Sequence, residues 1–194
     1  SLGEYNNKQL STLSSSVSGN VTTLFTQQDR ILFVGLNGNI VLSDFVLKFD
    51  TSHKKGKRFP GSNPLSGPWS EHEVSEFSFG ADYSGFNDLS INIELANAYI
   101  HKHNIQLANE QNEYGYSVRF DWRLYNDLLD LSLQHANILG DNGSFSAFSV
   151  AYEYSDRINI GGKIISFDSD NNTQQLFPYR HQDLIQLTLD YYFN

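Results

Sequence analysis

The chain has 194 residues, the length of one domain, and its 13 basic and 22 acidic residues give a formal net charge of −9. This acidic balance argues against nucleic acid as a partner, and the absence of cysteine excludes disulfides, thiolate metal sites and cysteine nucleophiles. Aromatic residues make up 14% of the chain, too many for an intrinsically disordered protein, and there is no run of 18 apolar residues to predict a transmembrane helix.

The first part of the chain differs from the rest. Residues 1–27 are rich in Ser, Thr and Gln and alternate poorly, so we predict a polar N-terminal segment or loop there. From residue 28 to 194, apolar residues recur at every second position, which predicts strands, because successive strand side chains point to opposite faces. Turn signals divide this part into about nine strands. Their predicted ranges are 30–42, 45–54, 73–84, 88–100, 113–125, 128–138, 145–155, 157–167 and 183–193.

The strand near residues 113–125 alternates most clearly. One face carries Tyr114, Tyr116, Val118, Phe120, Trp122 and Leu124, and the residues between them are small, polar or charged. The last strand repeats the pattern from Ile185 to Phe193. Because no segment has the spacing of a useful amphipathic helix, the sequence predicts an all-β chain.

The connections between the predicted strands alternate in length. Tight turns are expected near residues 43–44, 85–87, 126–127 and at Asp156, and longer polar loops at 55–72, 101–112, 139–144 and 168–182. Short turns at one end and long loops at the other are typical of an antiparallel transmembrane β-barrel. Bacterial barrels usually have an even number of strands. Either residues 1–27 therefore contain a tenth strand, or the chain is the C-terminal part of a larger barrel. We favour the larger barrel, which also accounts for the absence of Met.

A soluble β-sandwich is the main alternative fold, and the polar faces argue against it. They carry charges in the middle of the strands, as expected for residues that line a barrel lumen. The predicted lumen-lining residues are Lys48, Asp50, Glu94, Arg119, Asp121, Arg123, Asp130, Glu153, Lys163 and Asp190. In a small barrel they would fill the interior by pairing, and in a larger one they would line a water channel.

Aromatic residues collect where the apolar faces approach the tight turns. A tyrosine ring with its polar tip favours the boundary between membrane and water, so these residues predict one aromatic girdle of a barrel. The predicted girdle consists of Tyr83, Tyr125, Tyr154, Tyr191 and Phe193.

The last strand, residues 187–193 (LTLDYYF), resembles the C-terminal signature of Gram-negative outer-membrane proteins, which the barrel-assembly machinery reads. Residues 33–36 (FVGL), 42–48 (LSDFVLK), 80–86 (GADYSGF) and 93–97 (IELAN) resemble a proteobacterial outer-membrane β-barrel family of unknown function. Members are typically longer and are often encoded beside a resistance-nodulation-division-type permease and a lipid-binding-like periplasmic protein. The resemblance implies a C-terminal part of a barrel, a periplasmic or inner-membrane transport partner, and hydrophobic or lipid-like cargo.

Four groups of residues are candidates for chemistry or binding. His135 lies near Ser132, but the alternation puts these two on opposite faces, which argues against a local serine–histidine pair. The pair His101 and His103 and the loop at 168–172 resemble metal sites only in part, and we predict no metal. The basic cluster lies by loop parity outside the cell, where lipopolysaccharide phosphates are the nearest anions. It consists of Lys54, Lys55, Lys57 and Arg58, after His53.

The sequence thus predicts an outer-membrane β-barrel of a Gram-negative bacterium that acts as a pore or as the outer-membrane component of a transport system. A plugged structural or surface-binding barrel is the first alternative, and an outer-membrane lipid hydrolase is the second. We expect no cofactor and no enzymatic activity. The expected partners are outer-membrane lipids, lipopolysaccharide, the barrel-assembly machinery and a periplasmic or inner-membrane transport protein.

Overall fold

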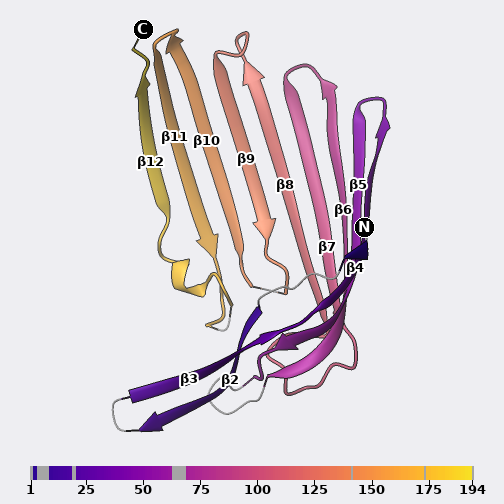
Figure 1. Cartoon of the computed structure of the whole chain (residues 1–194). Helices are drawn as coiled ribbons and strands as arrows, with labels where there is room; N and C mark the ends of the chain where they lie inside the picture. Colours follow the sequence, from indigo (N-terminus) through magenta and orange to yellow (C-terminus); the bar gives the residue numbers. More distant parts are fainter. Residues whose placement is uncertain are drawn as a thin grey trace. The chain divides into compact units, whose positions relative to one another are not determined.

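A computed structural model describes residues 2–3, 9–18, 21–62, 69–140, 142–172 and 174–193, with side chains from residue 30 onward. Ten strands form one sheet in the order β1-β4-β5-β6-β7-β8-β9-β10-β11-β12 (Figure 1). Among the described residues, no helix is long and apolar enough to cross a lipid bilayer. The chain consists of two compact units: unit 1 comprises residues 1–38, 50–78 and 97–113, and unit 2 comprises residues 39–49, 79–96 and 114–194.

The strands of the large sheet follow the chain order from β4 to β12. Their bounds are β1 Leu2–Gly3, β4 Leu32–Leu42, β5 Phe45–Phe59, β6 Ser70–Phe86, β7 Leu89–Ile100, β8 Asn112–Leu124, β9 Leu129–Asn137, β10 Ser144–Ser155, β11 Ile158–Asp168 and β12 Leu184–Tyr191. A short 3₁₀ helix, η1 (Phe177–Tyr179), precedes β12. Two further strands, β2 (Gln9–Ser18) and β3 (Val21–Asp29), form a separate antiparallel pair, which lies mostly within residues 1–27, the segment expected to be polar.

The predicted fold class, an antiparallel sheet of the transmembrane β-barrel type, is confirmed. All nine predicted strands are present as β4 to β12, and consecutive strands are neighbours in the sheet. In the strand order of the described residues, β1 and β12 each have one neighbour, so the sheet is a partial barrel that does not close. An unpaired strand edge is costly in lipid, because lipid cannot hydrogen-bond to backbone groups.

In unit 2, the register aligns each strand's alternation with that of its neighbours. One row across five strands is wholly apolar and consists of Phe120, Leu133, Phe148, Ile164 and Ile185. The adjacent row, which points to the opposite face, is wholly polar and consists of Asp121, Ser132, Ser149, Lys163 and Gln186. Side-chain alternation along each strand therefore becomes two chemically different faces of the sheet.

Among the described residues of unit 2, no second layer covers the apolar face of the sheet. Trp122 is 47% exposed and Leu187 is 86% exposed, although both belong to the apolar alternation. In a β-sandwich such residues would meet the other sheet in a dry core. A continuous surface of exposed large apolar side chains is unfavourable in water and favourable in hydrocarbon, so it indicates a face that contacts lipid.

In unit 1, the predicted loop at residues 55–72 is wrong in extent. β5 continues to Phe59 and β6 begins at Ser70, whereas the other predicted strand limits agree with the structure to within two residues. Gly56 adopts a positive φ of 89° inside β5, a conformation that glycine accepts readily and that interrupts the alternation. Beyond it, Phe59 and Val74 are buried, and their burial supports the longer strands.

Candidate functional site

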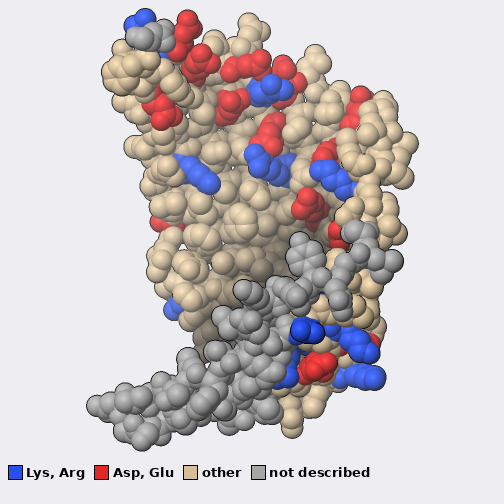
Figure 2. All heavy atoms as spheres, in the orientation of Figure 1, with Lys and Arg blue, Asp and Glu red and all other residues tan. Residues whose placement is uncertain are grey.

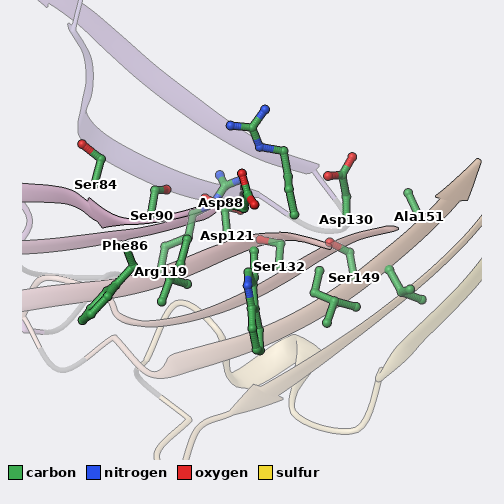
Figure 3. Close-up of a pocket in the computed structure, with 15 residues that line it drawn as sticks. Ser84, Phe86, Asp88, Ser90, Arg119, Asp121, Asp130, Ser132, Ser149 and Ala151 are labelled. Carbon is green, nitrogen blue, oxygen red and sulfur yellow. Dashed lines mark hydrogen bonds and ion pairs between the residues drawn. The ribbon is translucent and has the colours of Figure 1, made fainter. Parts of the chain in front are cut away.

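A cavity of about 520 Å³ lies in unit 2, where β8, β9 and β10 approach the turn between β6 and β7. Its polar lining includes Ser90, Arg119, Asp121, Arg123, Asp130 and Ser132. Figure 3 shows Ser84, Ser90 and Asp130 projecting to one side of the strands, while Phe86 points to the other side. The cavity therefore lies on the polar face of the sheet.

The centre of this site is an ion pair within one strand. Nε and Nη2 of Arg119 donate hydrogen bonds of 2.9 and 2.8 Å to Oδ1 of Asp121, two residues along β8. Asp121 lies directly opposite Ser132 of β9, and Arg123 lies directly opposite Asp130. Arg123 also pairs with Asp127 of the β8–β9 turn, with 3.5 Å between Nη1 and Oδ1. Charges of both signs thus alternate along this part of the wall.

A second charged group on this face includes a residue that the sequence analysis did not select. Nζ of Lys48 lies 2.5 Å from Oδ2 of Asp82, and the side-chain amide of Asn92 donates a hydrogen bond of 2.5 Å to the same carboxylate. Between Lys48 and Glu94 stands Gly80, where an added Cβ would lie 3.7 and 3.5 Å from their side chains. Asp82 could have been found from the alternation, because it lies two residues from Gly80 on the polar face.

The remaining predicted lumen residues of unit 2 share this polar face. In the register, Lys163 lies opposite Ser149 and Gln186, and Asn159 lies opposite Glu153 on one side and Asp190 on the other. Asp50 belongs to unit 1, where it is exposed. In the view of Figure 2, acidic side chains gather toward the tight-turn ends of the strands, with basic side chains interspersed.

The predicted girdle residues all lie at the tight-turn ends of strands in unit 2. The ring centroid of Tyr83 lies 4.6 Å from that of Phe45 and 5.3 Å from that of Phe86. Tyr125 adopts a positive φ of 55° within the β8–β9 turn, and Tyr154 is exposed beside the β10–β11 turn. The rings of Tyr191 and Phe193 lie 4.7 Å apart.

The basic cluster of unit 1 is divided between the two faces of β5. Nζ of Lys54 lies 2.5 Å from Oε2 of Glu76, and Nζ of Lys57 lies 3.5 Å from Oε1 of the same carboxylate. Lys55 points to the other face, where its Nζ lies 3.4 Å from Oε1 of Glu73 and its side chain is 63% exposed. Arg58 is partly buried. The alternation of β5 therefore separates lysines that are adjacent in sequence.

His135 lies on the apolar face, where it contacts a serine that the sequence analysis did not consider. Ser146 of β10 is directly opposite His135 in register, with 2.9 Å between its Oγ and Nδ1 of the imidazole. The hydroxyl of Tyr116 lies 3.3 Å from Nε2 of the same ring. Ser132 points to the other face, as expected. The sequence pattern could not select Ser146, because its pairing with His135 depends on the register.

The two partial metal motifs are held by other contacts. Nε2 of His101 lies 2.8 Å from Oγ of Ser75, whereas Nε2 of His103 lies 2.8 Å from the carbonyl oxygen of Asn109. In the 168–172 loop, Oε1 of Gln174 accepts hydrogen bonds from Ser169 and from nearby backbone amides. Where the structure describes the chain, three or more His, Asp or Glu side chains do not come together to hold a metal ion.

Comparisons with known proteins return structural matches only. No family model matches the chain, and no curated protein matches it. In-vitro folded OmpT, an outer membrane protein of Vibrio cholerae, matches with 18% identity over 74% of this chain and 46% of its own, with a TM-score of 0.47. The loop L8 deletion mutant of OmpT matches with 16% identity over 87% of this chain and 54% of its own, with a TM-score of 0.48. This chain thus spans about half the length of the structures that it matches.

The prediction that the chain is not an enzyme is corrected. The comparison returns OmpT, at a likeness that carries no argument about chemistry in either direction. The exclusion itself depended on the absence of a serine near His135 on the same face, and the Ser146–His135 contact removes that ground. The prediction was therefore wrong as it was made.

Proposed function

We propose that this chain forms part of the wall of a water-filled pore in the outer membrane of a Gram-negative bacterium, and that the pore prefers cations. The observation that carries the proposal is the pair of rows in unit 2, one apolar and exposed, the other polar and charged. A face of this polarity is stable beside water and costly beside lipid, so it supports an aqueous lumen rather than a lipid-filled one.

The preference for cations follows from the balance of charge on the polar face of unit 2. The basic residues there are Lys48, Arg119, Arg123 and Lys163. The acidic residues are Asp82, Glu94, Asp121, Asp130, Glu153 and Asp190. An excess of carboxylates along a water-filled wall raises the local concentration of cations. This wall favours hydrophilic solutes over the lipid-like cargo that the family resemblance implies, and a periplasmic or inner-membrane transport partner stays part of the proposal.

Replacing Asp121 and Asp130 together by asparagine is expected to move the pore toward anions. The double variant D121N/D130N removes the carboxylate that binds Arg119 and the one opposite Arg123, which keeps its contact with Asp127, so the potential of the wall becomes more positive. The reversal potential of the purified protein in a planar bilayer, under a KCl gradient, measures the change. We expect the permeability ratio of cation to anion to fall by about twofold or more.

Ser149→Ala is the control for this measurement, because Ser149 lines the same cavity and the substitution alters no charge. It is expected to leave the ratio unchanged. Two results would contradict the proposal: a bilayer without single-channel steps, or a double variant with the selectivity of the parent protein.

We also propose that Lys55 contacts lipopolysaccharide phosphates from the face of β5 opposite Lys54. Its side chain is exposed, whereas Lys54 is directed to Glu76 on the other face. Lys55→Ala is expected to weaken binding of lipopolysaccharide by about threefold, the scale of one exposed ion pair, while Lys54→Ala leaves it unchanged. Titration of the folded protein in detergent micelles with lipopolysaccharide tests this. Equal weakening by the two variants would contradict a role specific to Lys55.

A further inference from the structure

A hydrogen-bonded serine, histidine and tyrosine lie together on the apolar face of unit 2. Oγ of Ser146 is 2.9 Å from Nδ1 of His135, and the hydroxyl of Tyr116 is 3.3 Å from Nε2. Either neutral tautomer of the imidazole satisfies both contacts, and in one of them Nδ1 accepts the serine proton while Nε2–H donates to the tyrosine oxygen. This is the arrangement in which a base can take a proton from a nucleophile while a third group orients the base.

We propose that Ser146 and His135 form a catalytic pair that hydrolyses long-chain acyl esters presented by the membrane, with Tyr116 as a positioning residue. This activity is distinct from the proposed pore, whose charged residues lie on the opposite face of the sheet. The two proposals therefore use different surfaces and can fail independently.

The surroundings of the pair specify the class of substrate. On the same face lie Leu133, two residues before His135 in β9, and Phe148, two residues after Ser146 in β10; they are 50% and 42% exposed. Ser146 is near the start of β10 and His135 near the end of β9, so both lie toward the longer connections and away from the tight turns. An ester group at the bilayer surface could reach Ser146 while its acyl chain lies along the apolar face.

The reaction is an ordinary two-step acyl transfer. Oγ of Ser146 attacks the ester carbonyl carbon as its proton moves to Nδ1 of His135, and the tetrahedral intermediate then expels the alcohol oxygen, which takes that proton. Water next attacks the acyl-serine, His135 accepts a proton from the water, and the proton returns to Oγ as the fatty acid leaves. The net change is ester plus water to acid plus alcohol.

Tyr116 acts through His135. Its ring centroid lies 5.7 Å from that of the imidazole. In the reactive tautomer that we propose, its oxygen accepts from Nε2–H, which leaves Nδ1 without a proton and directed at Ser146. Loss of this hydroxyl is expected to slow the attack on a probe without changing how tightly the probe binds.

The experiment measures the rate of covalent labelling of the folded protein, in detergent micelles, by a fluorescent fluorophosphonate, and its hydrolysis of p-nitrophenyl palmitate. We expect the parent protein to react, Ser146→Ala to lose both activities, and His135→Ala to slow both by about 10²- to 10⁴-fold. Tyr116→Phe should lower the maximal labelling rate several-fold at unchanged probe affinity. Ser166→Ala is the matched control, because Ser166 pairs with Ser146 from β11, and it should react like the parent.

Two further measurements keep the test independent of folding. The heat-dependent mobility of each variant on an electrophoresis gel reports whether the barrel sheet is folded. Added imidazole should restore labelling of His135→Ala, which a purely structural role of His135 would not allow. The proposal is overturned if the folded parent protein is not labelled, if Ser146→Ala is still labelled at the parent's rate, or if imidazole does not rescue His135→Ala.

Discussion

Replacing Leu133 by arginine is expected to lower the free energy of unfolding of the membrane-inserted protein by about 2–4 kcal/mol, the cost of a cation on the lipid face near the middle of a bilayer. Leu133 lies in the middle of β9, between Phe120 and Phe148 in the register. All three side chains are substantially exposed on the apolar face. Because both neighbours in the row are phenylalanines, neither can form a hydrogen bond or an ion pair with the new guanidinium. The unfolding of protein inserted in lipid vesicles by guanidinium chloride, followed by tryptophan fluorescence, measures the change.

Ser132→Arg is the control for this prediction. Ser132 is the adjacent residue, but it points to the polar face and lies opposite Asp121, which can receive a cation. The free energy of unfolding of the Ser132→Arg variant is expected to differ from that of the parent protein by less than about 0.5 kcal/mol, as for a surface substitution. If the two arginine variants lose equal stability, the assignment of the apolar face to lipid is wrong.

Gly143→Ala is expected to have the second largest effect, a loss of about 1–3 kcal/mol. Gly143 lies between β9 and β10 with a positive φ of 94°, and an added Cβ would lie 2.7 Å from the carbonyl oxygen of Asp168. The backbone conformation and the close approach therefore both exclude a side chain. The carbonyl of Gly143 also accepts a hydrogen bond of 2.9 Å from the amide of Ile138, which ties this connection to the end of β9.

Gly161→Ala provides the comparison for Gly143→Ala under the same unfolding conditions. A Cβ at Gly161 would lie 3.5 Å from the nearest atom, the carbonyl oxygen of Val150, which is an ordinary contact. Its stability should change by less than about 0.5 kcal/mol. A loss at Gly143→Ala no larger than that at Gly161→Ala would show that the connection relaxes around the new side chain.

Local patterns in the sequence determined the strands, the tight turns and the two faces of each strand. This was possible because the side-chain period of a strand is two, so the residues between Tyr114 and Leu124 separate into faces without knowledge of any partner strand. The polar placement of Arg119 and Asp121 followed from the same rule. At Gly56, whose φ is positive, the alternation is interrupted, and the end of β5 and the start of β6 were misplaced.

The tertiary structure decided which residues meet across strands. The contact between Ser146 and His135, the shared carboxylate Glu76 of Lys54 and Lys57, and the Asp82 contacts to Lys48 and Asn92 all depend on register. Register depends on how neighbouring strands align over their whole length, so it cannot be deduced from the residues of one strand alone. The sequence by itself thus determined that one face is apolar and the other charged, and only the pairing of strands determined which side chains form a site.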